Sequence, residues 1–511
     1  MKNKITLLTE SKYLKLFIFF IGFISSVGYA PFNFFPITIF SFFIIIYLLT
    51  LNKNKKHNFF LYGFLYSLGN HLGLLYWIAI SFETADAGGY ILGAAAILIL
   101  CSFLAVFMGL AFYFLFKFFK NYKSIHFGIF FIFIFSLFDW LKGNIFWGFP
   151  WTPISTIWSF SSMTMYPFSI LGVWGYSLLT YSLIISFYYL LFNLRKAILF
   201  SFPFILSVLF LPKILNTEEI LIDTILLRVV QPNIKQEHKW NKNKLKENYE
   251  KLTSLTTQNN YKKFDLIILP ETAINFDIVE LKKITHKKKF GLDNIDNLIL
   301  GAVRAEKKNH DLKIYNTMYL IKKNFKNITY HDKLKLVPFG EFIPFRGLIN
   351  VDKLTSGNLD FSVGNKANFL KLSEKINILP LICYEVIFPK LSKSIKGDYN
   401  LIINITNDAW YRDSSGPYQH FSLAKIRAVM EGLTLIRAAN TGISGIIAPS
   451  GKVISKLSVD KKGVIDYKLN LKSVKTMYSI YGETLFYLIM LTLFFLTCIA
   501  FFYGKNKKSS L

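Results

Sequence analysis

Three side chains at the ends of apolar runs could together carry out acyl transfer. Glu271 follows "LIILP", Lys333 stands in "ITYHDKLKLVPFGE", and Cys383 closes "ILPLICYE". A thiol is a useful nucleophile only as a thiolate or beside a base, so it needs a carboxylate to take its proton. A cation would then stabilise the oxyanion that develops at the acyl carbon. These residue types make a complete set for acyl transfer.

Cys383 is the thiol that the sequence singles out. The chain has three cysteines, which form no even disulfide framework, and Cys101 and Cys498 lie within long apolar stretches. Each candidate alone is a weak signal, because a glutamate after a strand is more often a cap, a lysine is usually a solvated charge, and a buried cysteine is usually inert packing. The joint sequence context favours the catalytic interpretation.

Long apolar segments must surround these residues. The chain is 53% hydrophobic and 17% aromatic, which is too apolar for an ordinary soluble protein. A bilayer crossing needs about 20 apolar residues, and the sequence offers seven such segments before residue 216 and one at the end. The predicted spans lie near 13–30, 34–51, 58–80, 90–117, 126–146, 165–192, 197–215 and 484–503.

The loop charges predict an orientation. Basic loops such as "NKNKKH" (52–57) alternate with loops such as "SFETADAGG" (81–89), which carry no Lys or Arg. The positive-inside rule then places both termini in the cytoplasm and residues 216–483 on the outer face. Residues 1–215 would form seven transmembrane helices, and 484–511 the eighth with its tail. The first span could instead be a cleaved signal peptide, although Pro31 follows the candidate cut.

The net charge of +28 has two interpretations. A compositional bias toward Lys explains it most simply, with attraction to an anionic membrane surface as the alternative. The sequence contains no basic motif interleaved with aromatic residues, so it gives no indication of nucleic acid as a partner. The aromatic stretch "NIFWGFPWTP" (144–153) is typical of an interfacial belt, and it could equally admit a lipid chain.

The outer segment alternates buried strand-like runs with helix-like runs, which is typical of a layered α/β domain. Strands are expected at 224–234, 264–272, 297–303, 313–321, 376–385, 399–408, 434–442 and 444–454. Helices are expected at 241–258, 276–287 and 418–432.

The order of three motifs resembles the nitrilase superfamily, whose Glu-Lys-Cys triad is carried on an α-β-β-α sandwich. The motifs are Glu271-Thr272-Ala273 after "LP", "KLKLVPFGE", and Cys383-Tyr384-Glu385. With an eight-span frame, the chain is similar to the membrane-embedded apolipoprotein N-acyltransferase family, also through "GYAPF", "VQPNIKQEHKW", "TNDAWYRDSSGPYQH" and "RAANTGIS". The resemblance implies a nitrilase-like sandwich inserted between the seventh and eighth helices of an eight-helix transmembrane bundle.

The resemblance also implies roles for individual residues. Glu271 would be the general base, Cys383 the nucleophile, and Lys333 the triad lysine because it stands eight residues before Glu341; Lys335 is the alternative. The expected supporting residues are Glu341, Tyr384 and Glu385, and the expected substrate-binding residues are Trp240, Asn316 and Arg346. The chain departs from the family pattern at Arg412, where a glycine is common, and at Met430, where a glutamate is expected.

The implied reaction needs no cofactor and no metal. An acyl chain would pass from a glycerophospholipid to the thiol as a thioester, and then to the α-amino group of the diacylglyceryl-cysteine of an apolipoprotein, in the bacterial inner membrane. A membrane-tethered hydrolase using water as acceptor is one alternative. A transporter or scaffold is another, which the few charged residues within the spans disfavour, Asp139 and Lys142 being the clearest pair.

Overall fold

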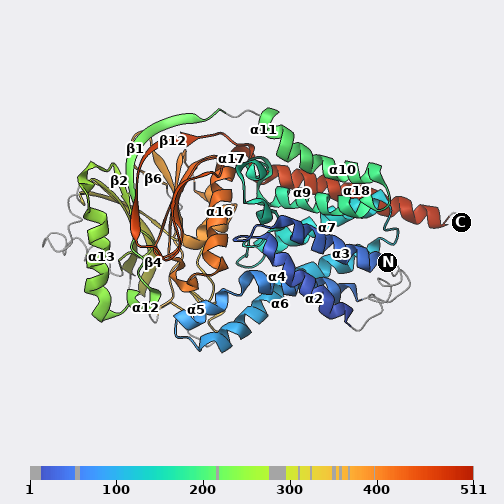
Figure 1. Ribbon diagram of the computed structural model, residues 1–511, viewed down its shortest axis with the longest axis horizontal. Helices are drawn as coiled ribbons and strands as arrows, with labels where there is room; N and C mark the ends of the chain where they lie inside the picture. Colours follow the sequence, from blue (N-terminus) through green and yellow to red (C-terminus); the bar gives the residue numbers. More distant parts are fainter. Residues whose placement is uncertain are drawn as a thin grey trace. The chain divides into compact units, whose positions relative to one another are not determined.

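The described residues form two compact units. The computed structural model describes residues 13–51, 58–214, 218–274, 295–308, 311–322, 325–347, 353–355, 359–365, 369–395 and 397–509. The helical unit comprises residues 1–76, 94–216 and 476–511, and the sandwich unit comprises residues 77–93 and 217–475. Figure 1 shows the elements of both.

Helices occupy the positions of the eight predicted spans. They are α2 (Leu14–Ser25), α3 (Phe35–Leu51), α4 (Phe59–Leu75), α5 (Ile78–Thr84), α6 (Gly89–Phe118), α7 (Ile125–Asn144), α9 (Phe168–Leu190), α10 (Leu194–Ile205), α11 (Leu211–Ile214) and α18 (Thr484–Ser509). The expected span 58–80 is divided between α4 and α5. The expected span 197–215 contains Pro203 and a π-helical turn at Leu206–Phe210, because proline removes a helical hydrogen bond.

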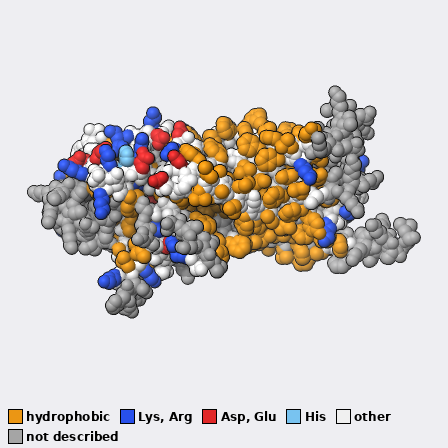
Figure 2. Space-filling model, turned by 90° about the horizontal axis from the view of Figure 1, so that it is seen from below, with side chains coloured by type: hydrophobic (Ala, Val, Ile, Leu, Met, Phe, Trp, Pro, Cys, Tyr) orange, Lys and Arg blue, Asp and Glu red, His pale blue; other side chains and the backbone are white. Residues whose placement is uncertain are grey.

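Four helices of the described chain are long and apolar enough to cross a membrane. They are α6, α7, α9 and the Thr484–Phe501 part of α18. Large hydrophobic side chains also cover the surface of the helical unit, for example Ile99 at 71% exposure and Ile198 at 56%. Figure 2 shows this hydrophobic surface, with charged side chains gathered over the sandwich unit. Such a surface would be unfavourable in water, which supports a membrane setting for these helices.

Two six-stranded sheets build the sandwich unit. The first has the order β12-β1-β2-β3-β4-β5 and the second the order β11-β10-β9-β8-β7-β6. The first contains β1 (Ile220–Gln231), β2 (Leu266–Ile268), β3 (Asn297–Lys308), β4 (Asp311–Lys322), β5 (Asn327–Asp332) and β12 (Gly463–Ser473). The second contains β6 (Leu370–Lys371), β7 (Asn377–Ile382), β8 (Leu401–Thr406), β9 (Thr434–Ala439), β10 (Ser444–Ile447) and β11 (Val453–Leu457).

The central strands of each sheet run parallel. In the first sheet β1, β2 and β3 are parallel neighbours, and in the second β7, β8 and β9 are. Their carboxyl ends therefore gather at one edge of each sheet, where side chains from different strands can meet. Glu271 follows β2 and Cys383 follows β7, so the sheet topology explains why both stand just beyond a buried strand.

A hydrophobic core joins the two sheets, and helices cover their outer faces. The core between the sheets includes Leu227, Ile268, Ile378 and Ile403, all fully buried. Helix α13 (Leu245–Thr257) packs Leu252 and Leu255 on the first sheet. Helix α16 (Ser415–Glu431) covers the second sheet, and Figure 1 shows α13 and α16 on opposite sides of the strands. This is an α-β-β-α arrangement, so the prediction of a nitrilase-like sandwich is confirmed.

The expected elements correspond closely to the observed ones. Each expected strand segment contains a strand, and the expected helices at 241–258 and 418–432 are α13 and α16. The expected helix at 276–287 lies outside the described residues. Strands β5, β6 and β12 were not expected, and the single strand expected at 444–454 is instead an antiparallel pair, β10 and β11. Strand β12 alternates polar and apolar residues and carries Asp466 and Lys468, so it lacks the continuous apolar run typical of buried parallel strands.

Candidate active site

A close approach of two backbones positions Glu271. The residue lies in the turn after β2, and its neighbour Thr272 has φ of 42°. Gly301 on β3 faces this turn, and a Cβ atom there would lie 2.4 Å from the carbonyl oxygen of Pro270 and 2.7 Å from the Cα atom of Glu271. Only glycine leaves room for the turn to pack on the strand.

Lys333, Glu271, Glu341 and Asn316 form one buried cluster. Lys333 Nζ lies 3.4 Å from Glu271 Oε1 and 2.9 Å from Glu341 Oε1. Asn316 Nδ2 donates to the same two oxygens, at 2.7 Å and 3.0 Å. Burial opposes the charged form of Lys333, but the carboxylates of Glu341 and Glu271 outweigh it and hold the lysine pKa well above its ordinary value.

Cys383 occupies a strained position beside this cluster. It follows β7 directly and has φ of 52°, a left-handed conformation that is rare for a residue other than glycine. The pKa of the Cys383 thiol is raised to about 12, because burial and the charge of Glu271 raise it by more than the charge of Lys333 lowers it. The resting thiol is therefore protonated, and a base must remove its proton before it can attack an acyl carbon.

Glu385 holds the loop around the cysteine. Its side chain is fully buried and accepts hydrogen bonds from the backbone N–H groups of Leu334, Lys335 and Ile382, at 2.6, 3.1 and 2.7 Å. These bonds join the segment after Lys333 to the segment before Cys383. A carboxylate with several backbone donors is a stable anchor even when it is buried.

The other expected site residues lie in different surroundings. Tyr384 is buried, with its ring in edge contact with Phe388 at a centroid distance of 4.9 Å. Trp240 is half-buried and ends the short helix α12 (Gln236–Lys239). Arg346 makes a two-bond ion pair with Asp360, at 2.6 and 2.9 Å, and its side chain is 45% exposed. The structure thus joins Asn316 to the carboxylate cluster and places Arg346 in an exposed ion pair.

Lys239 is a site residue that the sequence did not indicate. It is buried, and its Nζ atom donates to the backbone carbonyl of Glu271 at 3.0 Å. Burial lowers the pKa of Lys239 to about 8, while the negative charges of Glu271 and of an ionised Cys383 raise it. The site therefore contains a second lysine. In a chain so rich in lysine, no sequence signal separates Lys239 from a solvated charge.

A second cluster of buried polar side chains contacts the backbone of Cys383, and it was not predicted either. Asp408, His420 and Arg437 are at most 1% exposed and form hydrogen bonds with one another. His420 also reaches the backbone carbonyl of Cys383. Within the described residues, no three His, Cys, Asp or Glu side chains gather as a candidate metal site.

The structure accounts for the two departures from the family pattern. Arg412 has φ of 49° and ψ of −157°, close to a region that glycine alone adopts readily. Met430 is buried, and the adjacent Glu431 supplies the carboxylate, which pairs with Arg427 at 3.3 Å and accepts from Ser392. Neither departure alters the cluster around Lys333.

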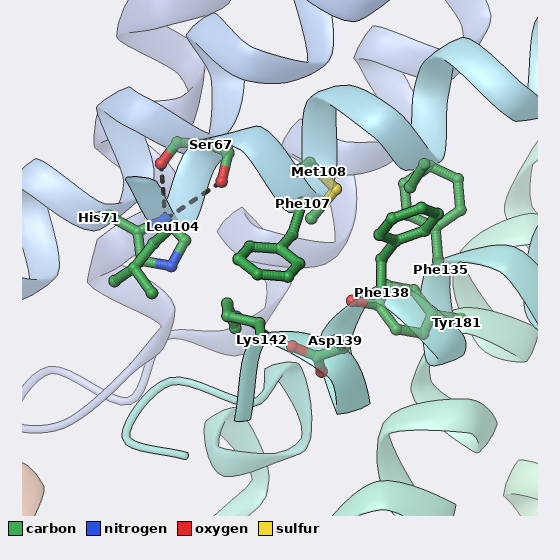
Figure 3. Close-up of a pocket in the computed structure, with 11 residues that line it drawn as sticks. Ser67, His71, Leu104, Phe107, Met108, Phe135, Phe138, Asp139, Lys142 and Tyr181 are labelled. Atoms are coloured by element: carbon green, nitrogen blue, oxygen red, sulfur yellow. Dashed lines mark hydrogen bonds and ion pairs between the residues drawn. The ribbon is translucent and has the colours of Figure 1, made fainter. Parts of the chain in front are cut away.

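A small cavity in the helical unit lacks the means for acyl transfer. Figure 3 shows it between α4, α6, α7 and α9, with the buried pair Asp139 and Lys142, 2.9 Å apart, at its wall. Lys142 donates to the Thr152 carbonyl at 3.3 Å, and Asp139 accepts from the N–H of Ile154 at 3.3 Å. The pair therefore holds residues 152–154, at the end of the aromatic stretch, against α7. No thiol is among the residues that line the cavity.

Comparison with known proteins identifies the family. Residues 21–186 match the apolipoprotein N-acyltransferase N-terminal domain, and residues 226–478 match the carbon-nitrogen hydrolase family. An apolipoprotein N-acyltransferase of Rickettsia prowazekii is 32% identical over 92% of this chain and 95% of its own length. That of Rhodopseudomonas palustris is 30% identical over 90% of each chain. A solved nitrilase-superfamily structure from Saccharomyces cerevisiae has a TM-score of 0.35 at 18% identity, covering 50% of this chain and 93% of that one.

The two family matches together cover residues 21–186 and 226–478, and so include both the helices and the sandwich that holds the candidate site. The chain therefore belongs to the apolipoprotein N-acyltransferase family of acyltransferases, as the sequence motifs predicted.

Proposed function

We propose that this chain transfers an acyl chain from a glycerophospholipid, through a thioester on Cys383, to the α-amino group of the N-terminal diacylglyceryl-cysteine of an apolipoprotein. The observation that carries the proposal is the buried cluster in which Lys333 contacts both Glu271 and Glu341, and in which the charges of Glu271 and Lys333 act on the Cys383 thiol. The names of the relatives supply the substrate class.

The first step forms the thioester. Glu271 takes the thiol proton, the Cys383 sulfur attacks the ester carbonyl, and the carbonyl electrons move onto oxygen, where the Lys333 cation stabilises them. The oxyanion then collapses, the ester C–O bond breaks, and Glu271 returns its proton to the departing lysophospholipid oxygen. Exchange of an ester for a thioester is close to thermoneutral, so this step needs no external energy source and no cofactor.

The second step consumes the thioester. The acceptor amine attacks the thioester carbonyl, a C–N bond forms and the C–S bond breaks; Glu271 takes the amine proton and passes it to the Cys383 sulfur. Asn316 suits a role in binding the amine, because its Oδ1 atom is buried and accepts no hydrogen bond from the described residues. Glu341, Tyr384 and Glu385 would support the site, and Trp240 and Arg346 would contact substrate.

The location of the site follows from the same proposal. Both substrates are lipids, so the catalytic domain, residues 216–483, would stand on the periplasmic face of the bacterial inner membrane. It would be inserted between the seventh and eighth of eight membrane helices, with both termini in the cytoplasm. Helices at each of the expected positions support this topology, as do the alternating loop charges.

A test of the acceptor separates transferase from hydrolase. The acyl-enzyme is prepared with phospholipid alone, and its thioester is followed by mass spectrometry. It should persist, and then discharge rapidly when a diacylglyceryl-cysteinyl peptide with a free α-amine is added. The same peptide with an acetylated amine should not discharge it, because no nucleophile remains.

Two controls complete the test. Cys383→Ala should form no acyl adduct, whereas substitution of Cys101 and Cys498 should leave adduct formation intact. If the thioester decays equally fast with the blocked peptide or with none, releasing free fatty acid, then water is the acceptor and the enzyme is a hydrolase.

A further inference from the structure

Two side chains from different elements of the sandwich unit contact the backbone carbonyl of Cys383. His420 on α16 places Nε2 at 3.2 Å from this oxygen, and Asn404 on β8 places Nδ2 at 3.5 Å from it. Asn404 Nδ2 also donates to the carbonyl of Leu381, on β7, at 2.9 Å. The peptide bond that follows the nucleophile is thus held by its carbonyl oxygen.

Arg437 and Asp408 fix the orientation of these two donors. Arg437 on β9 donates to Asn404 Oδ1, to Asp408 Oδ2 at 2.8 Å, and to His420 Nδ1 at 2.9 Å. Asp408, in the 3-10 turn at Asp408–Tyr411, lies 2.8 Å from His420 Nδ1. All four side chains are at most 1% exposed. Such a fully connected buried network has one arrangement, so it holds its neighbours rigidly.

The ring of His420 faces acceptors through both nitrogens. Asp408 Oδ1 lies at Nδ1 and the Cys383 carbonyl lies at Nε2. Burial and the charge of Arg437 lower the pKa of His420, so the ring is neutral at neutral pH and carries one proton. Arg437 can donate to Nδ1, and a ring protonated on Nε2 then donates to the Cys383 carbonyl.

Covalent geometry connects this carbonyl to the reaction. The Cys383–Tyr384 peptide is planar, and its C=O and N–H bonds point in opposite directions. Once the carbonyl is held toward His420 and Asn404, the N–H of Tyr384 must point away from them. A backbone N–H immediately after a nucleophile, on a strained turn between strand and helix, is placed to stabilise an oxyanion. The left-handed Cys383 directly follows β7 and begins a 3-10 helix.

We propose that Asn404, Asp408, His420 and Arg437 are positioning residues for acyl transfer. They hold the Cys383–Tyr384 peptide by its carbonyl, so that the N–H of Tyr384 is aimed at the oxyanion formed on the acyl carbon. Hydrogen bonds to the carbonyl also polarise the amide and strengthen its N–H as a donor. The proposal rests on the thioester chemistry of the proposed function, and it predicts a defect confined to steps that pass through an oxyanion.

Three variants at one position separate the two contacts of His420. His420→Leu removes both ring nitrogens, and with them the contacts to Asp408 and to the Cys383 carbonyl. His420→Gln keeps a donor near the position of Nε2 and can still reach the Cys383 carbonyl. His420→Asn keeps a polar group near the position of Nδ1, beside Asp408, but is too short to reach the carbonyl. Each variant is made in full-length protein that carries Cys101→Ala and Cys498→Ala, so that Cys383 is the one thiol.

Two reactions of Cys383 are then compared. Thioester formation with a fluorescent phospholipid passes through an oxyanion, whereas alkylation by iodoacetamide does not. In His420→Leu and His420→Asn, thioester formation should slow by about 10-fold to 100-fold, less than the cost of removing an oxyanion donor outright. Alkylation should stay within about 2-fold of the parent, and His420→Gln should recover most of the thioester rate.

The alternatives give different results. If alkylation falls by the same factor as thioester formation, the network controls the thiol or the fold, and the proposal is wrong. Equal thioester rates in His420→Gln and His420→Asn would also overturn it, because contact with the carbonyl would then be irrelevant. Failure of the parent protein to form any thioester would instead reject the proposed function.

Discussion

At the scale of single residues, the two carboxylates that contact Lys333 have different expected roles. We predict that Glu271→Gln slows thioester formation by about 10²-fold to 10⁴-fold, the usual effect of losing a general base. Glu341→Gln should leave part of the acylation, because Glu271 is still present to take the thiol proton. Rapid labelling with a fluorescent phospholipid measures both. Equal acyl-enzyme formation in the parent and Glu271→Gln would contradict the assignment of the base.

Asp408 gives a prediction about stability and pH. Burial favours its neutral form, but the charge of Arg437, the adjacent His420 ring and the hydrogen bond from Arg437 outweigh burial, and its pKa falls from 3.8 to about 2. A lowered folded-state pKa adds stability that is complete above about pH 4 and is lost as the pH falls through about 2. The contribution is about 2 kcal/mol.

Asp408→Asn tests this prediction. The variant cannot ionise at this position, so its stability should lack the part of the decline that the parent shows between about pH 4 and pH 2. Unfolding midpoints in detergent across this range measure the difference in slope. Parallel stability curves for the two proteins would show that Asp408 is not stabilised as an anion.

At the scale of secondary-structure elements, Gly301 determines how closely the Glu271 turn packs on β3. In Gly301→Ala, the new Cβ would meet backbone atoms of Pro270 and Glu271 at 2.4 and 2.7 Å, and backbone cannot move aside cheaply. A displacement of about 1 Å at a catalytic group can cost about 10²-fold in rate. We predict a loss of that order in thioester formation. Gly347→Ala is the matched control, since nothing lies within 4 Å of its Cβ.

The turn at Arg412 is expected to store strain. A residue other than glycine in such a conformation costs about 1–3 kcal/mol, and φ at Arg412 is 49°. Arg412→Gly should therefore raise stability by about 1 kcal/mol and the unfolding midpoint by about 2–4 °C. Lys375→Gly, in a turn where φ is not positive, should be neutral or destabilising, because glycine makes the unfolded chain more flexible. A lower midpoint for Arg412→Gly would show that the side chain contributes more than the strain costs.

The extent to which the fold could be predicted follows from the character of each element. The buried parallel strands β2, β7 and β8 are short apolar runs, and sequence periodicity identifies such runs directly. Strand β12 could not be recognised in this way. The segment forms a strand by antiparallel pairing with β1, which is more than 200 residues away in the sequence. Long-range pairing leaves little trace in local composition.

The residues of the candidate site also divide into those that the sequence could predict and those that it could not. Glu271, Lys333 and Cys383 stand in motifs with fixed neighbours, so sequence alone nominated them, and the structure brings Lys333 against Glu271 and places both charges near the thiol. Lys239 and His420 also stand in quoted motifs, "VQPNIKQEHKW" and "TNDAWYRDSSGPYQH", but nothing in the sequence assigned them a role. Their importance depends on burial and on backbone carbonyls, which a sequence does not display.

At the scale of the whole molecule, the orientation in the membrane determines which substrates can reach the site. A lipid-anchored acceptor that has crossed the inner membrane is available only on the periplasmic side. The loop charges predict that the segment 117–124 is cytoplasmic and that residues 216–483 are periplasmic. The described structure offers an exposed lysine in each region, Lys120 and Lys462, at which a cysteine can be introduced without disturbing a core.

The last prediction concerns these two positions. In protein that carries Ala at all three native cysteines, Lys462→Cys should react with a membrane-impermeant maleimide in intact spheroplasts, because the reagent reaches the outer face directly. Lys120→Cys should react after the membrane is permeabilised with detergent and not before, which also shows that its thiol is accessible. The membrane is a barrier to the charged reagent because transfer of a charge into hydrocarbon costs several kcal/mol. If Lys120→Cys were labelled in intact spheroplasts while Lys462→Cys was protected, the membrane orientation would be the reverse of the predicted one. The catalytic cysteine would then face the cytoplasm, where an acceptor lipoprotein displayed on the outer face could not reach it.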